Sequence, residues 1–503
     1  MVPKARARFR SETERGRMLG GPGWGRDAVR EFLQREFYVT PCGAVPKGTD
    51  PHGRIIHDYS FAPRDSFSLN SSLLENSVQY ISFTERVKAL SSVSWYFAVD
   101  LKNGYRQLPV HPRDWHTQVY SLGQYEHYVD VCMPFGKANS SKIFCFWVEN
   151  WCQAFKKNFR ALVPWPFVLE SYVDDIFGGA NSKIQTADLK NQIIKTGTLT
   201  TAVPNLAKCH GPSQKLAILG MMFDAVDRRV SLPPKKQQKY LLRLNEVLST
   251  GYVSSKDLEK IVGYLVWASY AEPFGRPFIS AVSAHISRVT PHKNVQLIGE
   301  LRTALLIWVS ILQRNKGISF TYILNQMVCS KDEWFVDAST SWGIGGCAGT
   351  RYFSLPNKAL TNLFALFGAF PDQGAMRVPS HRLPIAYIEL LAALVAMSVF
   401  SKFFPNMLII LNTDNTDVVA WLRKGRCSRG IGFKILTAIE FFKRKHGIKV
   451  SPRHIPGRFN TSADALSRGT FPGWVLRHGT RLTVDTTLLE SLIHSPLGFW
   501  THH

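Results

Sequence analysis

Three aspartates of the sequence stand where apolar runs typical of buried strands end or turn. Asp100 follows the run Trp95–Val99, and Asp174 and Asp175 separate two further runs, Leu169–Val173 and Ile176–Phe177. The second pattern predicts a hairpin with two acids at its tip. If these strands are neighbours in one sheet, three carboxylates converge on a rigid frame, which suits Mg²⁺. Two such ions about 4 Å apart are what nucleotidyl transfer requires.

A second set of acids is spread over residues 333–470. Its members are Asp337 in a strand pattern, Glu389 in a helical pattern, Asp414 after an apolar run, and Asp464. Each acid alone is typical of a helix cap, a strand-end turn or a surface charge. Four acids gathered in one place raise one another's pKa unless cations compensate them, so a gathered set would again indicate metal ions. His454 stands ten residues before Asp464.

The elements expected to position these acids change along the chain in three steps. From about residue 31 to 230, short apolar runs alternate with turns. Residues 235–325 have the helical spacing of Leu, Ile and Val, with basic outer faces. Residues 333–470 begin with a strand meander, continue with a helix at 388–400, and end with a helix from about residue 462.

The chain of 503 residues is strongly basic, with 61 Lys and Arg against 37 Asp and Glu and a formal net charge of +24. A polyanion such as nucleic acid is the simplest partner, because phosphate neutralisation gives affinity for any sequence. Excess charge without a partner and a membrane surface are the alternatives. None of the eight cysteines forms a CxxC pair, no secretory signal is visible, and the apolar stretch Leu390–Leu411 is interrupted by Lys402 and Pro405. We therefore expect an intracellular protein, in the cytoplasm or the nucleus, without a membrane span.

Ordered motifs between residues 99 and 220 resemble those of reverse transcriptases. Residues 99–105 (VDLKNGY) are similar to the family's DLKxGY segment, and 133–136 (MPFG), with Asn139 and Phe144, to its LPFG segment. Residues 172–175 (YVDD) resemble the YxDD box. The later KC and LG elements match residues 208–209 and 219–220.

This resemblance implies a role for each matching residue. Asp100 and Asp174 would bind two Mg²⁺ ions, or Mn²⁺ in their place, with Asp175 adjacent. Tyr105 would be a gate under the sugar that excludes a 2′-hydroxyl and so favours dNTPs; the alternative is a plain core tyrosine. Lys208 would approach the triphosphate and protonate the leaving pyrophosphate, unless it is a surface lysine. The floor beneath the incoming nucleotide would be formed by Phe135 and Gly136.

Upstream, residues 45–47 (VPK) and 54–59 (RIIHDY) resemble the fingers hairpin of the same family. Lys47 and Arg54 would grip the triphosphate there. Ser141 stands where the family usually has proline, and Asn103 and Ser60 replace commoner residues. These departures could alter the nucleotide floor, but they remove no metal ligand.

The second set of acids follows the D…E…D…D order of ribonuclease H. The resemblance implies that Asp337, Glu389, Asp414 and Asp464 bind two Mg²⁺ ions. His454 would lie on a mobile loop and assist proton transfer or product release. An intact fold with weak or lost activity is the alternative.

Together the resemblances imply an α+β fold. It would consist of a right-hand polymerase, with fingers, a palm built on an antiparallel sheet and a helical thumb, followed by a ribonuclease H-like α/β domain. The expected division is a basic flexible arm at 1–30, fingers and palm at 31–234, thumb and connection at 235–328, the ribonuclease H-like domain at 329–470, and a C-terminal tail at 471–503.

The implied protein binds an RNA template, a DNA primer and dNTPs, copies RNA and then DNA, and degrades the RNA of RNA–DNA hybrids. RQLPVHP, KDLEKIVGYL and HIPGRFNTSADALSR are similar to retrotransposons of the DIRS type, with gypsy-like elements and plant pararetroviruses as near relatives. A domesticated, nonenzymatic nucleic-acid-binding protein on the same fold is the main alternative. An RNA-templated RNA polymerase is opposed by Tyr105 and the second set of acids. The primer type and the oligomeric state stay open.

Overall fold

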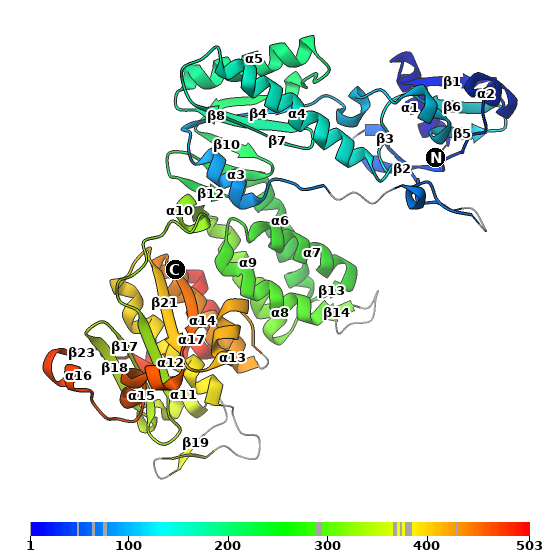
Figure 1. Cartoon of the computed structure of the whole chain (residues 1–503). Helices are drawn as coiled ribbons and strands as arrows, with labels where there is room; N and C mark the ends of the chain where they lie inside the picture. The colour runs from blue at the N-terminus through cyan, green and yellow to red at the C-terminus, as the bar shows by residue number, and fades with distance from the viewer. Residues whose placement is uncertain are drawn as a thin grey trace. The chain divides into compact units, whose positions relative to one another are not determined.

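The computed structural model describes residues 2–47, 50–62, 66–73, 78–286, 294–365, 370–372, 375–377, 385–427 and 430–502. The chain divides into two compact units, Met1–Leu219 with Phe223–Arg228, and Gly220–Met222 with Arg229–His503. Both units contain strands and helices (Figure 1).

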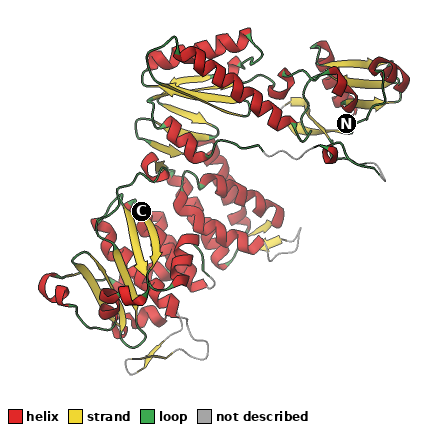
Figure 2. Cartoon of the chain, in the orientation of Figure 1, coloured by secondary structure: helices red, strands yellow, loops and turns green. Residues whose placement is uncertain are grey.

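The centre of the first unit is an antiparallel sheet with strand order β7-β8-β4-β9. Its strands are rich in aromatic and β-branched residues, which favour a pleated, half-buried surface: β7 (Phe167–Tyr172), β8 (Asp175–Ala180), β4 (Trp95–Asp100) and β9 (His210–Ser213). Two helices, α4 (Ser140–Arg160) and α5 (Lys183–Leu199), pack against it (Figure 2). Their buried side chains recur every three or four residues and close a core over the sheet, so the strand ends are held rigidly.

The rest of the first unit contains two smaller sheets. β2 (Cys42–Lys47) and β3 (Asp50–His57) form an antiparallel hairpin. β1 (Met18–Pro22), β6 (Glu126–Asp130) and β5 (Val119–Gly123) form a three-stranded antiparallel sheet. The unit also contains α2 (Arg26–Leu33), α3 (Phe83–Leu90) and β10 (Lys215–Ile218), and the division between the units falls within β11 (Met221–Asp224).

The expectation of a flexible arm at residues 1–30 is wrong. α1 (Val2–Glu14) buries Ala5, Phe9 and Glu12, which share one helix face because they are three and four residues apart. Phe9 lies 5.0 Å from the ring of Tyr128 and 5.5 Å from that of Tyr120. The N-terminal segment is therefore part of the first unit's core.

The second unit begins with a group of helices joined by short strands. The helices are α6 (Pro234–Thr250), α7 (Ser255–Ala268), α8 (Arg276–Ile286) and α9 (Gly299–Arg314). β12 (Arg229–Ser231) pairs with β15 (Ile318–Ser319), and β13 (Tyr252–Ser254) pairs with β14 (Asn294–Gln296). α10 (Phe320–Ile323) follows β15.

The second unit continues with a six-stranded sheet of order β22-β21-β16-β17-β18-β23. β16 (Trp334–Ala338), β17 (Gly343–Ala348) and β18 (Arg351–Pro356) form the expected antiparallel meander, while β21 (Leu408–Thr413) and β22 (Lys449–His454) run parallel to β16. The remaining elements are α11 (Thr361–Ala365), β19 (Phe370–Asp372), β20 (Ala375–Arg377), α12 (Ile385–Phe400), α13 (Thr416–Lys424), α14 (Gly430–His446) and α15 (Thr461–Ser467).

The apolar α12 is the core helix of this unit. Together with the next turn, it is the one stretch of the described residues long and apolar enough to cross a membrane. However, 83% of that stretch is buried inside the protein. Packing therefore accounts for its composition.

The expectation of a C-terminal tail at residues 471–503 is also wrong. This segment forms α16 (Gly473–His478), β23 (Thr480–Arg481), α17 (Thr486–His494) and α18 (Pro496–His502). Trp500 is buried, with its ring 5.4 Å from that of Phe278 on α8. The hydroxyl of Ser310 on α9 donates a hydrogen bond to the backbone carbonyl of Trp500. The C-terminal segment therefore packs against α8 and α9 and is not an unpacked tail.

Candidate active sites

The three acids of the first set meet at one end of the β7-β8-β4-β9 sheet. Asp100 ends β4 and is the register partner of Asp175, which begins β8. Tyr172 pairs with Asp175 across the expected hairpin, and Val173 and Asp174 form its turn. The backbone carbonyl of Asp174 accepts a hydrogen bond from the N–H of Leu101, at 2.8 Å. The predicted convergence of these acids is therefore present in the backbone.

The hairpin turn stores local strain. Val173 has a φ of 55°, in the left-handed region that a β-branched residue rarely adopts. Such outliers cost free energy and persist only where the surroundings enforce them. At this turn, the strand pairing on both sides holds Asp174 beside Asp100.

Asp100 has a basic partner and an amide donor, whereas burial and neighbouring acids raise the pKa of Asp175. The ammonium of Lys208 lies 3.1 Å from both carboxylate oxygens of Asp100, and the amide of Asn205 donates a hydrogen bond to the same carboxylate at 3.3 Å. Burial, together with repulsion from Asp174 and Asp100, raises the pKa of Asp175 to about 6. Lys208 was predicted to lie at this site, whereas Asn205 was missed because no motif singled it out.

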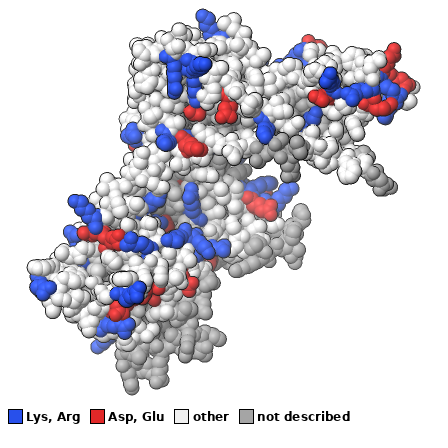
Figure 3. Space-filling view, in the orientation of Figure 1, with Lys and Arg blue, Asp and Glu red and all other residues white. Residues whose placement is uncertain are grey.

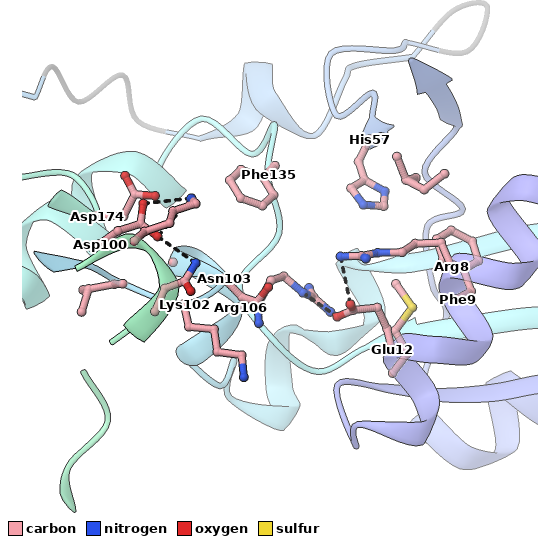
Figure 4. A pocket seen from close by; sticks show the side chains of 16 residues that line it. Arg8, Phe9, Glu12, His57, Asp100, Lys102, Asn103, Arg106, Phe135 and Asp174 are labelled. Carbon is pink, nitrogen blue, oxygen red and sulfur yellow. Dashed lines mark hydrogen bonds and ion pairs between the residues drawn. The ribbon is translucent and has the colours of Figure 1, made fainter. Parts of the chain in front are cut away.

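A pocket of about 440 Å³ opens beside Asp100 and Asp174 (Figure 4). Its wall includes the predicted Phe135 and Lys208, but also Arg8 and Glu12 of α1 and His57 at the end of β3. Burial, aided by the charge of Arg106, lowers the pKa of His57 to about 3, so this ring is neutral at working pH. Sequence reasoning missed Arg8 and Glu12 because they come from a segment that was expected to be mobile, and it gave His57 no role within the 54–59 motif.

A buried ion cluster holds this wall together. The guanidinium of Arg106 lies 2.6 Å from a carboxylate oxygen of Asp130 and 3.3 Å from one of Glu12. All three residues are less than 10% exposed. Buried charges are stable only when paired, so the cluster ties α1 to the segment that carries Asp100 and Tyr105.

The predicted nucleotide-binding residues are placed as follows. The ring of Tyr105 packs against Phe135, and Gly136 has a φ of 93°. A Cβ at Gly136 would lie 2.5 Å from the carbonyl oxygen of His57, so only glycine fits. Lys47 and Arg54 lie in β2 and β3, but their side chains fall outside the described residues.

The four acids of the second set also gather at one place. Asp337 lies on β16, Glu389 on α12 and Asp464 on α15, while Asp414 follows β21. Burial, together with repulsion from Asp414 and Asp337, raises the pKa of Glu389 to about 7. Burial, together with repulsion from Asp414 and Asp464, raises the pKa of Asp337 to about 6. Asp414 therefore lies within electrostatic reach of both Glu389 and Asp337, and Asp464 within reach of Asp337.

Hydrogen bonds fix the carboxylates of this second set. Thr413 donates to Glu389 at 3.2 Å, Asn415 donates to the other oxygen of Glu389 at 3.3 Å, and Ser467 donates to Asp337 at 2.5 Å. The guanidinium of Arg468 lies 2.8 Å from Asp464. None of these four supporting residues was predicted.

His454 ends β22, in register with Thr413, one residue before Asp414. It is exposed. The loop that follows passes close to the acids, because a Cβ at Gly457 would lie 3.1 Å from a carboxylate oxygen of Asp414. His454 therefore lies beside the second set of acids.

Both sets were tested for their fit to divalent cations. Over the part of the chain that the structure describes, no three His, Cys, Asp or Glu side chains lie close enough together to hold one ion as they stand. One basic side chain pairs with an acid in each set, Lys208 with Asp100 and Arg468 with Asp464. Burial, and after it repulsion from neighbouring acids, raises the pKa of Asp175 and Glu389, so these carboxylates are costly to ionise as they stand. Hard cations with oxygen ligands would offset that cost, so both acid sets fit Mg²⁺.

Comparison with known proteins addresses the first set. Residues 47–223 match the family model described as "Reverse transcriptase (RNA-dependent DNA polymerase)". These residues are therefore similar to the reverse transcriptase family. The matched segment contains Asp100, Asp174, Asp175 and Lys208, and it ends near the boundary between the two units. No curated protein sequence matches the chain.

Solved structures are similar to the chain in fold. The foamy viral protease-reverse transcriptase dRH in complex with double-stranded DNA is 14% identical, with a TM-score of 0.50, covering 88% of this chain and 68% of that chain. This likeness shows a reverse-transcriptase polymerase fold. Another foamy viral protease-reverse transcriptase, also with double-stranded DNA, is 15% identical with a TM-score of 0.49, covering 90% of this chain and 83% of that one.

Proposed function

We propose that the first unit adds dNTPs to a DNA primer, copying an RNA template and then a DNA template. The observation that carries this proposal is the register pair Asp100–Asp175 with Asp174 in the adjoining turn, inside a segment of the reverse transcriptase family. Reverse transcriptases in general use divalent metal ions. When bound, two such ions would stabilise the charge that develops on the attacking and leaving oxygens.

The side chains of the first unit would bind the metal ions and the dNTP and transfer a proton. Asp100 and Asp174 would hold the ions, with Asp175 beside them. Lys208, which reaches Asp100, would give a proton to the leaving pyrophosphate. Tyr105 would exclude a 2′-hydroxyl, while Phe135 and Gly136 shape the floor under the base. Lys47 and Arg54 would grip the triphosphate.

Primer extension on an RNA template, with Mg²⁺ and labelled primer, tests this proposal. We expect extension by the parent chain and a loss of at least about 1,000-fold in Asp174→Asn, because one carboxylate ligand is removed. Asp464→Asn is the matched control, since it makes the same change in the second set of acids and leaves extension intact. No extension by a folded parent chain that binds the duplex, with Mg²⁺ or Mn²⁺ and several primers, would refute polymerase activity.

We further propose that the second unit cleaves the RNA strand of RNA–DNA hybrids. The carrying observation is that burial, together with repulsion from neighbouring acids of the set, raises the pKa of both Asp337 and Glu389. These acids would hold Mg²⁺ while water attacks the phosphodiester and the 3′-oxygen leaves. His454 lies at the exposed end of β22 beside Asp414, rather than on a loop as expected, and would assist proton transfer or product release.

Cleavage of a hybrid whose RNA strand is labelled tests the second activity. We expect cutting by the parent chain and by Asp174→Asn, but none by Asp464→Asn. The reciprocal pattern of the two variants in the two assays would establish separate sites. Binding without turnover in both assays would instead favour the domesticated, nonenzymatic protein.

We place this activity in the replication of a retrotransposon of the DIRS type, inside the cell. The support is the similarity of RQLPVHP, KDLEKIVGYL and HIPGRFNTSADALSR to that group, with gypsy-like elements and pararetroviruses close by. The partners would be an RNA template, a DNA primer and the RNA–DNA hybrid. Basic side chains gathered over α4 and α5 agree with a polyanionic partner (Figure 3).

A further inference from the structure

The side chain of Tyr105 is held on three sides. Its ring lies 4.7 Å from that of Phe135, edge to face at 65°, and 4.7 Å from that of Phe144, tilted by 32°. Its hydroxyl donates a hydrogen bond to the hydroxyl oxygen of Ser141, at 2.9 Å. Ser141 stands in the first turn of α4, so a rigid element fixes the acceptor.

The environment keeps this hydrogen bond in place at working pH. Burial raises the pKa of Tyr105, so the phenol stays protonated and remains a donor. Two neighbours of the ring, Gly104 and Phe135, line the pocket beside Asp100 and Asp174. A movement of this ring would therefore change the shape of the wall where the sugar of a nucleotide is expected.

We infer that Ser141 is a positioning residue for sugar discrimination, acting through the hydroxyl of Tyr105. This inference rests on the proposed polymerase activity. Aromatic packing on two sides restrains the plane of the ring, and among the described residues Ser141 supplies the hydrogen bond that restrains its hydroxyl end. Without the hydrogen bond to Ser141, the ring of Tyr105 can tilt away from a 2′-hydroxyl and relieve the steric clash. The site would then accept ribonucleotides more readily. Proline, which the family usually carries here, offers no hydroxyl for such a bond.

The measurement is the ratio of kcat/KM for dTTP to that for UTP, in primer extension by the full chain. We expect Ser141→Ala and Tyr105→Phe each to lower this ratio by about three- to ten-fold, the range set by one net hydrogen bond. The double variant should be no worse than either single variant, because both remove the same bond. Ser141→Thr keeps a hydroxyl and should retain most of the discrimination.

Ser140→Ala is the matched control, since it makes the same change one residue earlier on the same helix. It should leave the ratio unchanged, while thermal unfolding of every variant checks that folding is intact. A ratio that is unchanged in Ser141→Ala, with extension intact, would overturn this inference alone. Additive effects of the two changes would overturn it as well. A parent chain that extends no primer would overturn the proposed polymerase activity together with it.

Discussion

Glu389 is a buried carboxyl whose pKa is raised to about 7, far above its ordinary value of 4.5. The unfolded chain would release this proton near pH 4.5, whereas the folded chain keeps it until about pH 7. The contribution of protonated Glu389 to the free energy of unfolding is therefore fully present below pH 4.5 and is lost as the pH rises through 7. The acid therefore destabilises the fold at neutral pH and above, where it is ionised.

Glu389→Gln should remove this penalty. In EDTA at pH 8 we expect the variant to be more stable than the parent chain by about 3 kcal/mol. At pH 4 both states of the parent carry the proton, so the two proteins should unfold alike. Urea unfolding at the two pH values provides the measurement. Equal stabilities at pH 8 would mean that Glu389 does not lie in the buried, acid-rich environment described above.

At the residue scale, ordered motifs predicted the acids but not the groups that support them. Asp100, Asp174 and Asp175 stand out because strand ends and a hairpin tip can be read locally. Glu12 and Arg106 are 94 residues apart, and Ser467 and Asp337 are 130 apart. The sequence around each of these residues contains no pattern that indicates its distant partner. The role of Ser141 was equally hidden, although the position itself was noticed as a departure from the family.

At the element scale, α1 shows how a sequence can mislead. Arginines dominate residues 1–17, and only Ala5, Phe9 and Glu12 face inward. Those three positions have helical spacing. Three apolar or inward positions among so many charged residues are too weak a pattern to predict a packed helix. The β7–β8 hairpin was predicted correctly because its apolar strands and acidic turn are contiguous.

The packing of α1 makes a prediction for Phe9, which is 1% exposed. Phe9→Ala should destabilise the first unit by about 3–4 kcal/mol, since it leaves a cavity among Tyr120 and Tyr128. Phe67→Ala is the control, because Phe67 is 87% exposed and should contribute nothing measurable. Thermal unfolding compares the two. If residues 1–30 were a free arm, the two variants would behave alike.

At the scale of the whole molecule, the net charge of +24 predicts how binding responds to salt. The affinity for an RNA–DNA hybrid should fall by about 100-fold or more between 50 and 200 mM KCl, as counterions are released. Fluorescence anisotropy in EDTA, which prevents turnover, is the measurement. Asp174→Asn should show the same slope, because it loses no phosphate contact. An affinity that does not respond to salt would contradict a phosphate-dominated interface.

The molecular scale was also the hardest to predict in detail. The order of strand-rich, helical and again strand-rich regions was visible in the sequence. The pairing of β16 with β21 and the docking of α18 on α9 join segments far apart in the chain, and local patterns carry no signal of either. The residues expected to be thumb and the residues expected to be ribonuclease H-like lie within one compact unit.

The burial of Trp500 has a consequence for the order in which the protein is made. Ser310, which binds its carbonyl, is synthesised 190 residues earlier. During translation, the apolar surfaces of α8 and α9 that Trp500 covers stay exposed to solvent until Trp500 has left the ribosome. The first unit needs only residues up to 228 and can fold in the meantime. A chaperone that shields apolar surface would therefore be needed chiefly between the synthesis of α9 and that of α18, and termination before α18 would leave a folded first unit attached to an incompletely packed second one.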